Sequence, residues 1–260
     1  MKQKASNSMR LFALPDIPEI HAGDDLAAVI SQATYACGER YQDGDIVVIA
    51  QKIVSKAEGR TRRLADIVPS PAAQELSARS GKDARKVQAI LDESEQIVRV
   101  AAFPPDGLII ARHRHGWVCA NAAIDESNVG EDGVLLLLPL DPDASAAKIA
   151  AHLSKDAGVN IGVIVTDTFG RAWRRGLVNV AIGVAQVPAI VSWIGQTDAY
   201  GRKLYASEPA FADEIAAASG LLMGKDSGTP VIVVRGLNWD ADGEANAKQF
   251  VRPIKEDLFL

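Results

Sequence analysis

The stretch Ile161-Gly-Val-Ile-Val-Thr166 has the composition of a buried strand, and the polar segment Asp167-Thr-Phe-Gly-Arg171 follows it directly. Short β-branched runs bounded by Gly, Asp or Pro recur elsewhere in the chain and predict further buried strands. These runs are Asp45-Ile-Val-Val-Ile-Ala50, Gly133-Val-Leu-Leu-Leu-Leu138 and Pro230-Val-Ile-Val-Val-Arg235.

Helical patterns lie between the strand patterns. Because strands and helices alternate, we expect an α/β or α+β fold. The stretch from Arg174 to Trp193 is rich in Val, Ile, Gly and Ala and fits a strand and a helix equally well, whereas Phe103-Pro-Pro-Asp-Gly107 predicts a turn. The helical patterns span residues 24–40, 71–80, 83–98, 143–157 and 208–222.

Length and composition limit the class of protein. At 260 residues the chain is near the upper limit for one domain, so we expect a single domain or two intimately packed subdomains. With 48% hydrophobic and 23% charged residues, the composition is that of a soluble globular chain and excludes intrinsic disorder. The net charge of −5 means that any phosphate site must use local basic residues, and it argues against nucleic-acid binding.

The cysteine content and the N-terminus indicate a cellular location. Cys37 and Cys119 are too few and too far apart for a disulfide framework or a cysteine metal site, which favours a reducing compartment. The N-terminus is polar and has no apolar stretch of signal-peptide length. The longest aliphatic run, residues 134–138, is far shorter than the roughly 20 residues of a membrane helix. We therefore expect a cytoplasmic protein that has no membrane segment.

Asp167 and Thr168 follow the predicted strand at 161–166. A carboxylate beside a hydroxyl at the end of a buried strand suits a hard divalent cation, because Mg²⁺ prefers oxygen ligands and often shares them with substrate phosphates. Arg171, Arg174 and Arg175 come within eight residues of this acid, a density that suits a phosphorylated or carboxylated ligand. From residue types alone, an Asp cap with solvated arginines explains the pattern equally well.

Asp125 and Asn128 form a second polar group. Three residues apart, they can face one site, the acid as a cation ligand and the amide as a contact to a base or sugar. Asx residues in loops more often form turns, so this signal is weak by itself. His113 and His115 lie on one side of a strand without a third soft ligand nearby, which argues against zinc.

Two more segments suit phosphate. Lys52 and Lys56 follow the strand at 45–50 and can supply point charges to a polyphosphate, although the glycine spacing of a Walker loop is absent. Residues 223–230 form a Gly-rich turn whose backbone N–H groups can surround a phosphate. Each segment alone is as consistent with an ordinary solvated loop. Together, carboxylates, lysines and Gly-rich backbone at strand ends predict a metal-dependent nucleotide site that lacks a P-loop.

Longer and more unusual motifs extend through nearly the whole chain. They are Leu14-Pro-Asp-Ile17, Lys52-Ile-Val-Ser-Lys-Ala-Glu-Gly59, His115-Gly-Trp-Val-Cys-Ala-Asn-Ala122, Asp125-Glu-Ser-Asn128, Asp167-Thr-Phe-Gly-Arg171, Asp198-Ala-Tyr-Gly-Arg202, Asp213-Glu-Ile-Ala216 and Val251-Arg-Pro253. In this order they resemble the γ-glutamyl ligase family that elongates the tail of the deazaflavin coenzyme F420.

The resemblance implies an unusual α/β fold with mixed sheets and flanking helices, and an intertwined homodimer. It also implies an amide ligase that uses GTP with Mg²⁺ or Mn²⁺, often helped by K⁺. The expected reaction activates a substrate carboxylate of the deazaflavin acceptor as an acyl phosphate, which the amine of L-glutamate then attacks. Such chemistry needs cations at the γ-phosphate, positive side chains at the transferring phosphoryl group and a site closed to water.

Site residues can be carried over from the resemblance position by position. Asp125 and Asp167 are expected to ligate one cation, and Thr168 is expected to help with a second. The guanine nucleotide is expected to contact Leu14, Pro15, Asp16, Ile17, Gln51, Lys52, Lys56, Asn128 and the turn that contains Met223, Gly224, Lys225 and Gly228.

Two departures from the family pattern affect these expectations. Lys225 stands where family members tend to have Gln or Glu as a ligand of the second cation, and a protonated lysine cannot ligate. Either Asp226 or a backbone carbonyl substitutes, or the second cation site differs here. The chain also ends at Leu260 without the flavin-binding nitroreductase-like domain of some relatives, so we do not expect that activity.

Arg171, Arg174 and Arg175 are candidate catalytic residues on the basis of their chemistry and not of the resemblance. They would bind the phosphodiester or the glutamate carboxylates of the substrates. Two other functions remain open, namely a ligase that joins an amino acid to a different phosphorylated acceptor, and a non-catalytic GTP-binding protein.

Overall fold

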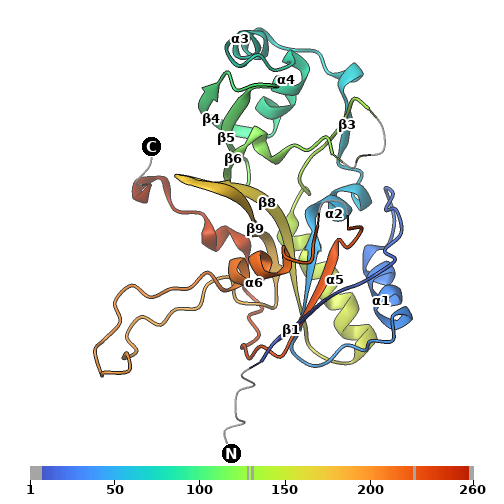
Figure 1. Cartoon of the computed structure of the whole chain (residues 1–260), viewed down its shortest axis with the longest axis vertical. Helices are drawn as coiled ribbons and strands as arrows, with labels where there is room; N and C mark the ends of the chain where they lie inside the picture. Colours follow the sequence, from blue (N-terminus) through green and yellow to red (C-terminus); the bar gives the residue numbers. More distant parts are fainter. Residues whose placement is uncertain (1–7, 128, 130–131, 225–226, 258–260) are drawn as a thin grey trace, which may run out of the picture.

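The computed structural model describes residues 8–127, 129, 132–224 and 227–257 (Figure 1). The strands are β1 (Arg10–Ala13), β2 (Asp45–Ala50), β3 (Thr61–Arg63), β4 (Ser94–Ala101), β5 (Leu108–His113), β6 (Val118–Ala120), β7 (Val134–Leu136), β8 (Ile161–Arg171), β9 (Arg174–Ala185) and β10 (Val231–Arg235). The α-helices are α1 (Leu26–Ala36), α2 (Gln51–Ala57), α3 (Pro71–Ser80), α4 (Ala84–Asp92), α5 (Pro142–Ala157) and α6 (Phe211–Ser219). Short 3₁₀ helices are η1 (Leu64–Asp66), η2 (Asn121–Ala123), η3 (Ala247–Phe250) and η4 (Ile254–Glu256).

A five-stranded sheet in the order β1-β10-β2-β8-β9 forms the body of the protein. β2 and β8 run parallel and the other neighbours run antiparallel, so the sheet is mixed, as predicted. Ile232 pairs with both Ala13 and Val48, and Ala50 pairs with Thr166. These pairs show that β1 and β2 end, and β10 begins, at the edge of the sheet where the buried part of β8 also ends.

Helices cover both faces of this sheet (Figure 1). α1, α2 and α5 cover one face, and their core includes Ile30, Leu153 and Val163. α6 and the C-terminal segment cover the other face, where the core includes Ile164 and Ile215. Val163 and Ile164 belong to different cores because successive residues of a strand point to opposite faces.

A small lobe, built from α3, α4 and the antiparallel sheet β4-β5-β6, lies at the top of Figure 1. It has its own core, which includes Val87 and Ile109. Buried Glu93 of the lobe accepts hydrogen bonds from Arg60 and Arg114, and Arg60 also donates to the Leu138 carbonyl at 2.9 Å. Because Arg60 lies in the segment between α2 and β3, this charge cluster joins the lobe to the body.

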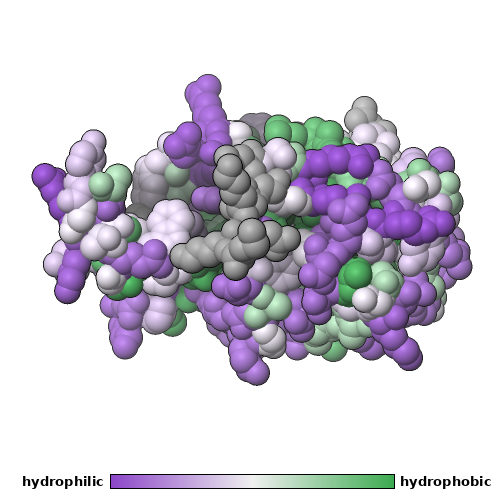
Figure 2. All heavy atoms as spheres, turned by 90° about the horizontal axis from the view of Figure 1, so that it is seen from below, coloured by the Kyte–Doolittle hydropathy of each residue, from purple (hydrophilic) through white to green (hydrophobic). Residues whose placement is uncertain are grey.

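An arm formed by residues 190–210 extends from the body between β9 and α6 (orange in Figure 1). Its two limbs bond to each other, from Trp193 N to Ser207 O at 2.9 Å and from Gly195 N to Leu204 O at 2.9 Å. The sequence motif from Asp198 to Arg202 forms the turn at the tip of the arm. In the view from below, hydrophilic side chains cover most of the surface and hydrophobic ones form small patches (Figure 2).

Most predicted elements are confirmed, with shifted ends, and one is partly wrong. β2 and α3 have the predicted bounds, the turn at 103–107 joins β4 to β5, and the undecided stretch contains β9. The helix predicted over residues 83–98 ends at Asp92, and β4 begins at Ser94. The Ser94 hydroxyl donates to the Ile90 carbonyl and ends the helix, and the β-branched residues beyond it favour a strand.

β8 is longer than predicted. Residues 161–166 are buried as expected, but the strand continues through Asp167 and pairs with β9 as a two-stranded ribbon that leaves the body. Asp167 and Thr168 therefore lie within a strand and not in a loop after it. Among the described residues, no helix is long and apolar enough to cross a membrane.

Candidate active site

The polar segments predicted from the sequence meet at the shared edge of the sheet. Residues 14–17 follow β1, α2 begins immediately after β2, and the turn at 220–230 leads into β10. Asp167 lies one residue beyond Thr166, the partner of Ala50 at the end of β2. The carboxyl ends of parallel strands are the usual place for ligands in α/β proteins, so this edge is the candidate site.

Asp125 lies at this edge next to Lys52. Lys52 Nζ is 2.6 Å from Asp125 Oδ2, and the Ser127 backbone N–H donates to Asp125 Oδ1 at 2.7 Å. Two backbone hydrogen bonds with Leu136 hold Asp125 in place. Burial raises the pKa of Asp125, but the hydrogen bonds from Lys52 and Ser127 outweigh it, so the pKa is lowered and the carboxylate is ionised at neutral pH.

Asp167 is the second carboxylate of the cluster. Burial and the nearby charge of Asp125 raise its pKa to about 7, although the Thr168 backbone N–H and Lys52 favour the ionised form. Gln51 also lowers the pKa of Asp167, and its Nε2 is buried without a partner in hydrogen-bond geometry. Gln51 Oε1 accepts from the Ser55 hydroxyl at 2.8 Å, which turns the amide nitrogen away from α2.

These carboxylates fit a hard divalent cation. Asp125 and Asp167 lie close together, and the raised pKa of Asp167 shows that its ionised form is unfavourable there. A bound cation would stabilise both ionised carboxylates. Within the described ranges, no group of three or more His, Cys, Asp and Glu side chains surrounds a potential metal position. Phosphate and water oxygens would therefore supply the remaining ligands, as is usual for Mg²⁺.

Thr168 faces the opposite side of the β8–β9 ribbon from Asp167. Its hydroxyl donates to Asn179 Oδ1 at 3.0 Å, and Asn179 Nδ2 contacts Met223 Sδ at 3.7 Å. The structure thus brings Thr168 close to the turn after α6 but does not place its side chain among the Asp125 and Asp167 carboxylates.

The other predicted nucleotide contacts surround the same edge. Leu14 is buried and bonds through its N–H to the Val231 carbonyl, so residues 14–17 lie beside the start of β10. Lys56 follows Lys52 by one helical turn and pairs with Glu19. Gly224 and Gly228 lie in the described part of the turn, whereas Asn128, Lys225 and Asp226 lie outside the described residues.

The arginines lie apart from this edge. Arg171, Arg174 and Arg175 are exposed at the tip of the β8–β9 ribbon, where Arg171 donates to the Arg175 carbonyl at 2.8 Å. Arg171 is four residues beyond Asp167, which corresponds to about 13 Å along a strand. The structure therefore does not bring them beside the carboxylates.

Three neighbours of the site were missed from the sequence. Asn179 is in the stretch that fitted strand and helix equally, so its strand partner could not be identified. Ser127 lies inside a predicted motif but had no assigned role, and Cys119 was considered only as a thiol. Burial raises the pKa of Cys119 to about 12, and the charge of Asp167 adds to this rise. Cys119 therefore lies near Asp167.

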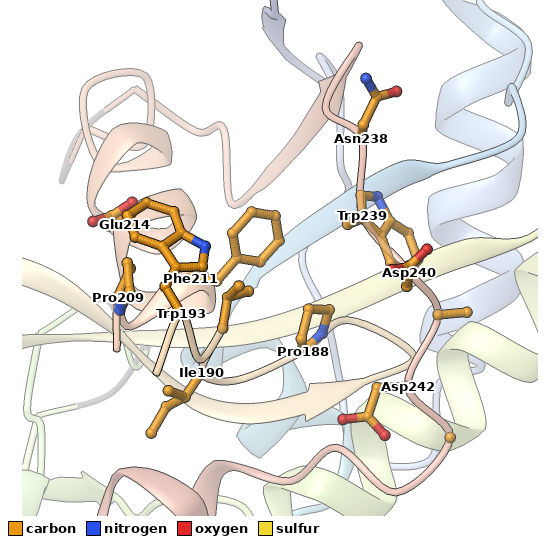
Figure 3. A pocket seen from close by; sticks show the side chains of 13 residues that line it. Pro188, Ile190, Trp193, Pro209, Phe211, Glu214, Asn238, Trp239, Asp240 and Asp242 are labelled. Carbon is orange, nitrogen blue, oxygen red and sulfur yellow. The ribbon is translucent and has the colours of Figure 1, made fainter. Parts of the chain in front are cut away.

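A separate cavity of about 730 Å³ lies at the base of the arm. Trp193, Pro209 and Phe211 line one side, and Trp239 and Asp242 of the C-terminal segment line the other (Figure 3). None of its lining residues belongs to the predicted site.

Comparison with known proteins agrees with the resemblance seen in the motifs. Residues 16–236 match the family model described as F420-0:Gamma-glutamyl ligase. The chain is 45% identical to a coenzyme F420:L-glutamate ligase of Archaeoglobus fulgidus, over 96% of both chains. It is 45% identical to the enzyme of the same name from Methanothermobacter thermautotrophicus, over 96% of this chain and 98% of the relative. The ligase of Methanopyrus kandleri is 42% identical over 97% of this chain and 98% of the relative.

Proposed function

The chain belongs to the F420-0:γ-glutamyl ligase family, and we propose that it joins L-glutamate to the deazaflavin coenzyme F420-0 with GTP as the energy source. It is an acid–amino-acid ligase. The observation that carries the choice of site is the pair of carboxylates, Asp125 and Asp167, beside Lys52 at the shared edge of the sheet. We take residues 1–260 as one ligase domain.

The proposed reaction has two steps. An oxygen of the acceptor carboxylate attacks the γ-phosphorus of GTP, and GDP leaves with the bridging oxygen. The amine of L-glutamate then attacks the carbonyl carbon of the acyl phosphate, phosphate leaves, and the amine loses a proton as the amide forms. Positioning and charge neutralisation carry most of the catalysis in such transfers.

A divalent cation, Mg²⁺ or Mn²⁺, would be held by Asp125 and Asp167, with a second near Thr168 and K⁺ as an accessory ion. The cation would neutralise charge on the phosphates of GTP. Lys52 then has two roles in this chain. Its ammonium group holds Asp125 in position at 2.6 Å and adds positive charge next to the transferring group.

The guanine nucleotide would lie along the edge, between residues 14–17, α2 and the turn at Met223 and Gly224. Glu19, two residues beyond Ile17, pairs with Lys56 of α2, so the segment after β1 contacts α2, which supports a common binding surface. The described part of the turn supplies backbone N–H groups at Gly224 and Gly228.

Arg171, Arg174 and Arg175 would bind the acceptor at a distance from the carboxylates. An exposed cationic tip suits the phosphodiester and the acidic tail of an extended substrate. Arg175→Ala is then expected to raise the KM for the acceptor with little change in kcat, because the lost contact is present in both ground and transition states.

The homodimer is part of the proposal. The arm exposes Tyr200 and Tyr205 at 89% and 80%, and Trp193 and Ile194 near its base are about half exposed. Large exposed aromatic side chains on an extension are typical of an interface. The cavity at the base of the arm, which both aromatic and acidic side chains line, offers a place for the arm of a second copy, which would intertwine the two chains.

Phosphate release tests the reaction. We expect rapid release from GTP only when the acceptor and glutamate are both present with a divalent cation. Equal release without any acceptor would indicate a simple GTPase. GTP binding that no acceptor converts into turnover would indicate a binding protein.

A further inference from the structure

We propose that Asn121 is a positioning residue that, through the left-handed turn that it begins, fixes Asp125 beside Lys52 in the candidate active site. The proposal rests on the proposed function, because it assumes that Asp125 acts in the ligation reaction. Asn121 lies in the sequence motif at residues 115–122, to which the proposed function assigns no role. The turn is η2, and only Ile124 separates it from Asp125.

Three successive residues of η2 have a left-handed backbone. The φ angles of Asn121, Ala122 and Ala123 are 52°, 52° and 56°. This conformation is unfavourable for residues other than glycine, which adopt it singly and seldom in succession. Asparagine tolerates it better than most residues, so Asn121 is suited to begin the turn. Such a backbone persists only where surrounding contacts hold it, and such places are common at active sites.

The Asn121 side chain fixes the start of the turn. Its Oδ1 accepts the backbone N–H of Ile109 in β5 at 3.2 Å. The pairing of β5 with β6 ends at Ile110 and Ala120, so the side chain of Asn121 continues it where the backbone turns away. Because Ile109 is fully buried, loss of the amide oxygen would deprive a buried N–H of its acceptor.

The rest of the turn lies at the boundary between the small lobe and the body. Ala122 is fully buried in the core of the lobe. Ala123 packs instead against the core that the sheet forms with α1, α2 and α5. A turn of the opposite hand would direct these two side chains differently, so the two cores together hold η2 in its left-handed form.

Asp125 follows the turn and is held by both parts of the protein. Its backbone N–H and carbonyl both bond to Leu136, and its carboxylate lies 2.6 Å from Lys52 Nζ of the body. The next residue, Glu126, pairs at 2.9 Å with Lys86 of α4 in the lobe. The place of Asp125 relative to Lys52 therefore depends on the direction in which η2 leaves β6.

Hydrogen exchange of the protein without ligands tests the positional link. In Asn121→Ala, the amide protons of Asp125 and Leu136 should exchange about tenfold faster or more, because their mutual hydrogen bonds open more often. The amide protons of β2 should exchange as in wild type, which shows that the body is intact. Asn121→Asp keeps the acceptor and tolerates a left-handed backbone, so its exchange should be close to that of wild type.

Mn²⁺ binding in the presence of GTP, and steady-state ligation, test the consequence for the reaction. In Asn121→Ala we expect the Mn²⁺ affinity and kcat each to fall about tenfold or more, as is usual when a residue that orients a ligand is lost. The KM for L-glutamate should stay unchanged, and Asn121→Asp should restore both quantities. A role in folding alone would lower the unfolding temperature without this split between kcat and KM.

Asn160→Ala is the matched control, because the Asn160 side chain bonds to Asp43 at the surface. Its Mn²⁺ affinity and kcat should equal those of wild type. If Asn121→Ala does not fold, Asn121→Gly replaces it, since glycine accepts the left-handed backbone but offers no acceptor. Wild-type exchange and Mn²⁺ affinity in the variant without the acceptor, or failure of Asn121→Asp to restore them, would overturn the proposal.

Binding and turnover separate this proposal from the proposed function. A wild-type protein that binds Mn²⁺ and GTP but never extends an acceptor would reject the ligase chemistry, and the exchange and binding comparisons would still decide the role of Asn121. A wild-type protein that binds neither would overturn both.

Discussion

Asp125 and Asp167 lie in one site, yet their pKa values are shifted in opposite directions. Lys52 and Ser127 keep Asp125 ionised, whereas burial and the charge of Asp125 raise the pKa of Asp167 to about 7. The sequence suggested Asp167 as a cation ligand from its place after a strand and Asp125 from its spacing to Asn128, and the family resemblance implied both. The pKa difference depends on Gln51, Lys52 and Ser127, which approach from other elements, and the sequence could not reveal it.

Replacement of Asp167 by Asn should separate activity from stability. We expect ligation to fall at least a hundredfold, because the neutral amide no longer attracts the cation. The cation-free variant should unfold at a higher temperature than wild type at pH 8, because an ionised Asp167 is destabilising there. This gain should shrink at pH 5, below the pKa of Asp167, where wild type is neutral at this position.

Asp92→Asn is a suitable control, since Asp92 is an exposed partner of Arg62 at the end of α4 in the small lobe. Normal GTP-dependent ligation by Asp167→Asn would show that the cation is assigned to the wrong residues.

Cation binding should depend on pH. Below about pH 7 a proton occupies Asp167 and must leave before a cation binds, so the apparent affinity for Mn²⁺ should fall by up to about tenfold per pH unit. Above pH 7 the affinity should level off. Calorimetric titrations between pH 5.5 and pH 8.5 would measure it, with Asp167→Asn expected to show weak, nearly pH-independent binding. A wild-type Mn²⁺ affinity that does not change with pH would contradict the raised pKa of Asp167.

At the scale of elements, the mixed sheet depends on an ion pair between partly exposed Arg235 and buried Asp45. Arg235 at the end of β10 bonds through Nε and Nη2 to both oxygens of Asp45, at 2.9 Å and 2.7 Å, where β2 begins. Asp45 is only 1% exposed, so loss of its partner leaves a buried charge. The strand patterns predicted β2 and β10 but not that they pair, because register depends on contacts distant in sequence.

Arg235→Met should therefore lower the free energy of unfolding by about 3 kcal/mol. Arg10→Met is the matched control, because Arg10 is more than half exposed where it pairs with Glu39. Arg10→Met should lower the free energy of unfolding much less than Arg235→Met does. Denaturant titrations would measure both, and equal losses would contradict the role assigned to the Arg235 pair.

The β8–β9 ribbon marks the limit of sequence-based prediction at this scale. The β-branched run at 161–166 predicted the buried half of β8, but not its continuation, because residues 167–171 resemble a polar loop. β9 has a β-bulge at Ile182, and Asp213, which accepts the neighbouring Ala181 N–H, belongs to α6, which lies about thirty residues later in the chain.

At the scale of the whole molecule, the C-terminal segment spans the body and the small lobe. Ala247 N donates to Asp143 Oδ1 at 2.9 Å in the body, and Arg112 of the lobe pairs with Asp257. Val251 packs on Gly116, where a Cβ atom would meet Val251 Cγ1 at 2.8 Å. The motif at residues 251–253 gave no hint of this connection, because its meaning depends on contacts with distant parts of the chain.

The arm should hold two copies together. Replacing Tyr200 and Tyr205 by Ser removes exposed aromatic area and should convert dimer to monomer, as sedimentation equilibrium would show. Phe103→Ser, on the small lobe and 66% exposed, is the control and should remain dimeric. A monomeric wild type, or a dimer unchanged by the double substitution, would contradict this role.

Mass spectrometry of the deazaflavin acceptor tests the central claim most directly. After incubation of the wild-type chain with F420-0, GTP, Mn²⁺ and L-glutamate, the acceptor should gain the mass of a glutamyl residue, with GDP and phosphate formed in equal amounts. Omission of GTP or Mn²⁺, or the Asp167→Asn substitution, should leave the mass unchanged. An unchanged acceptor in the complete reaction, with a folded protein that binds GTP, would contradict the account.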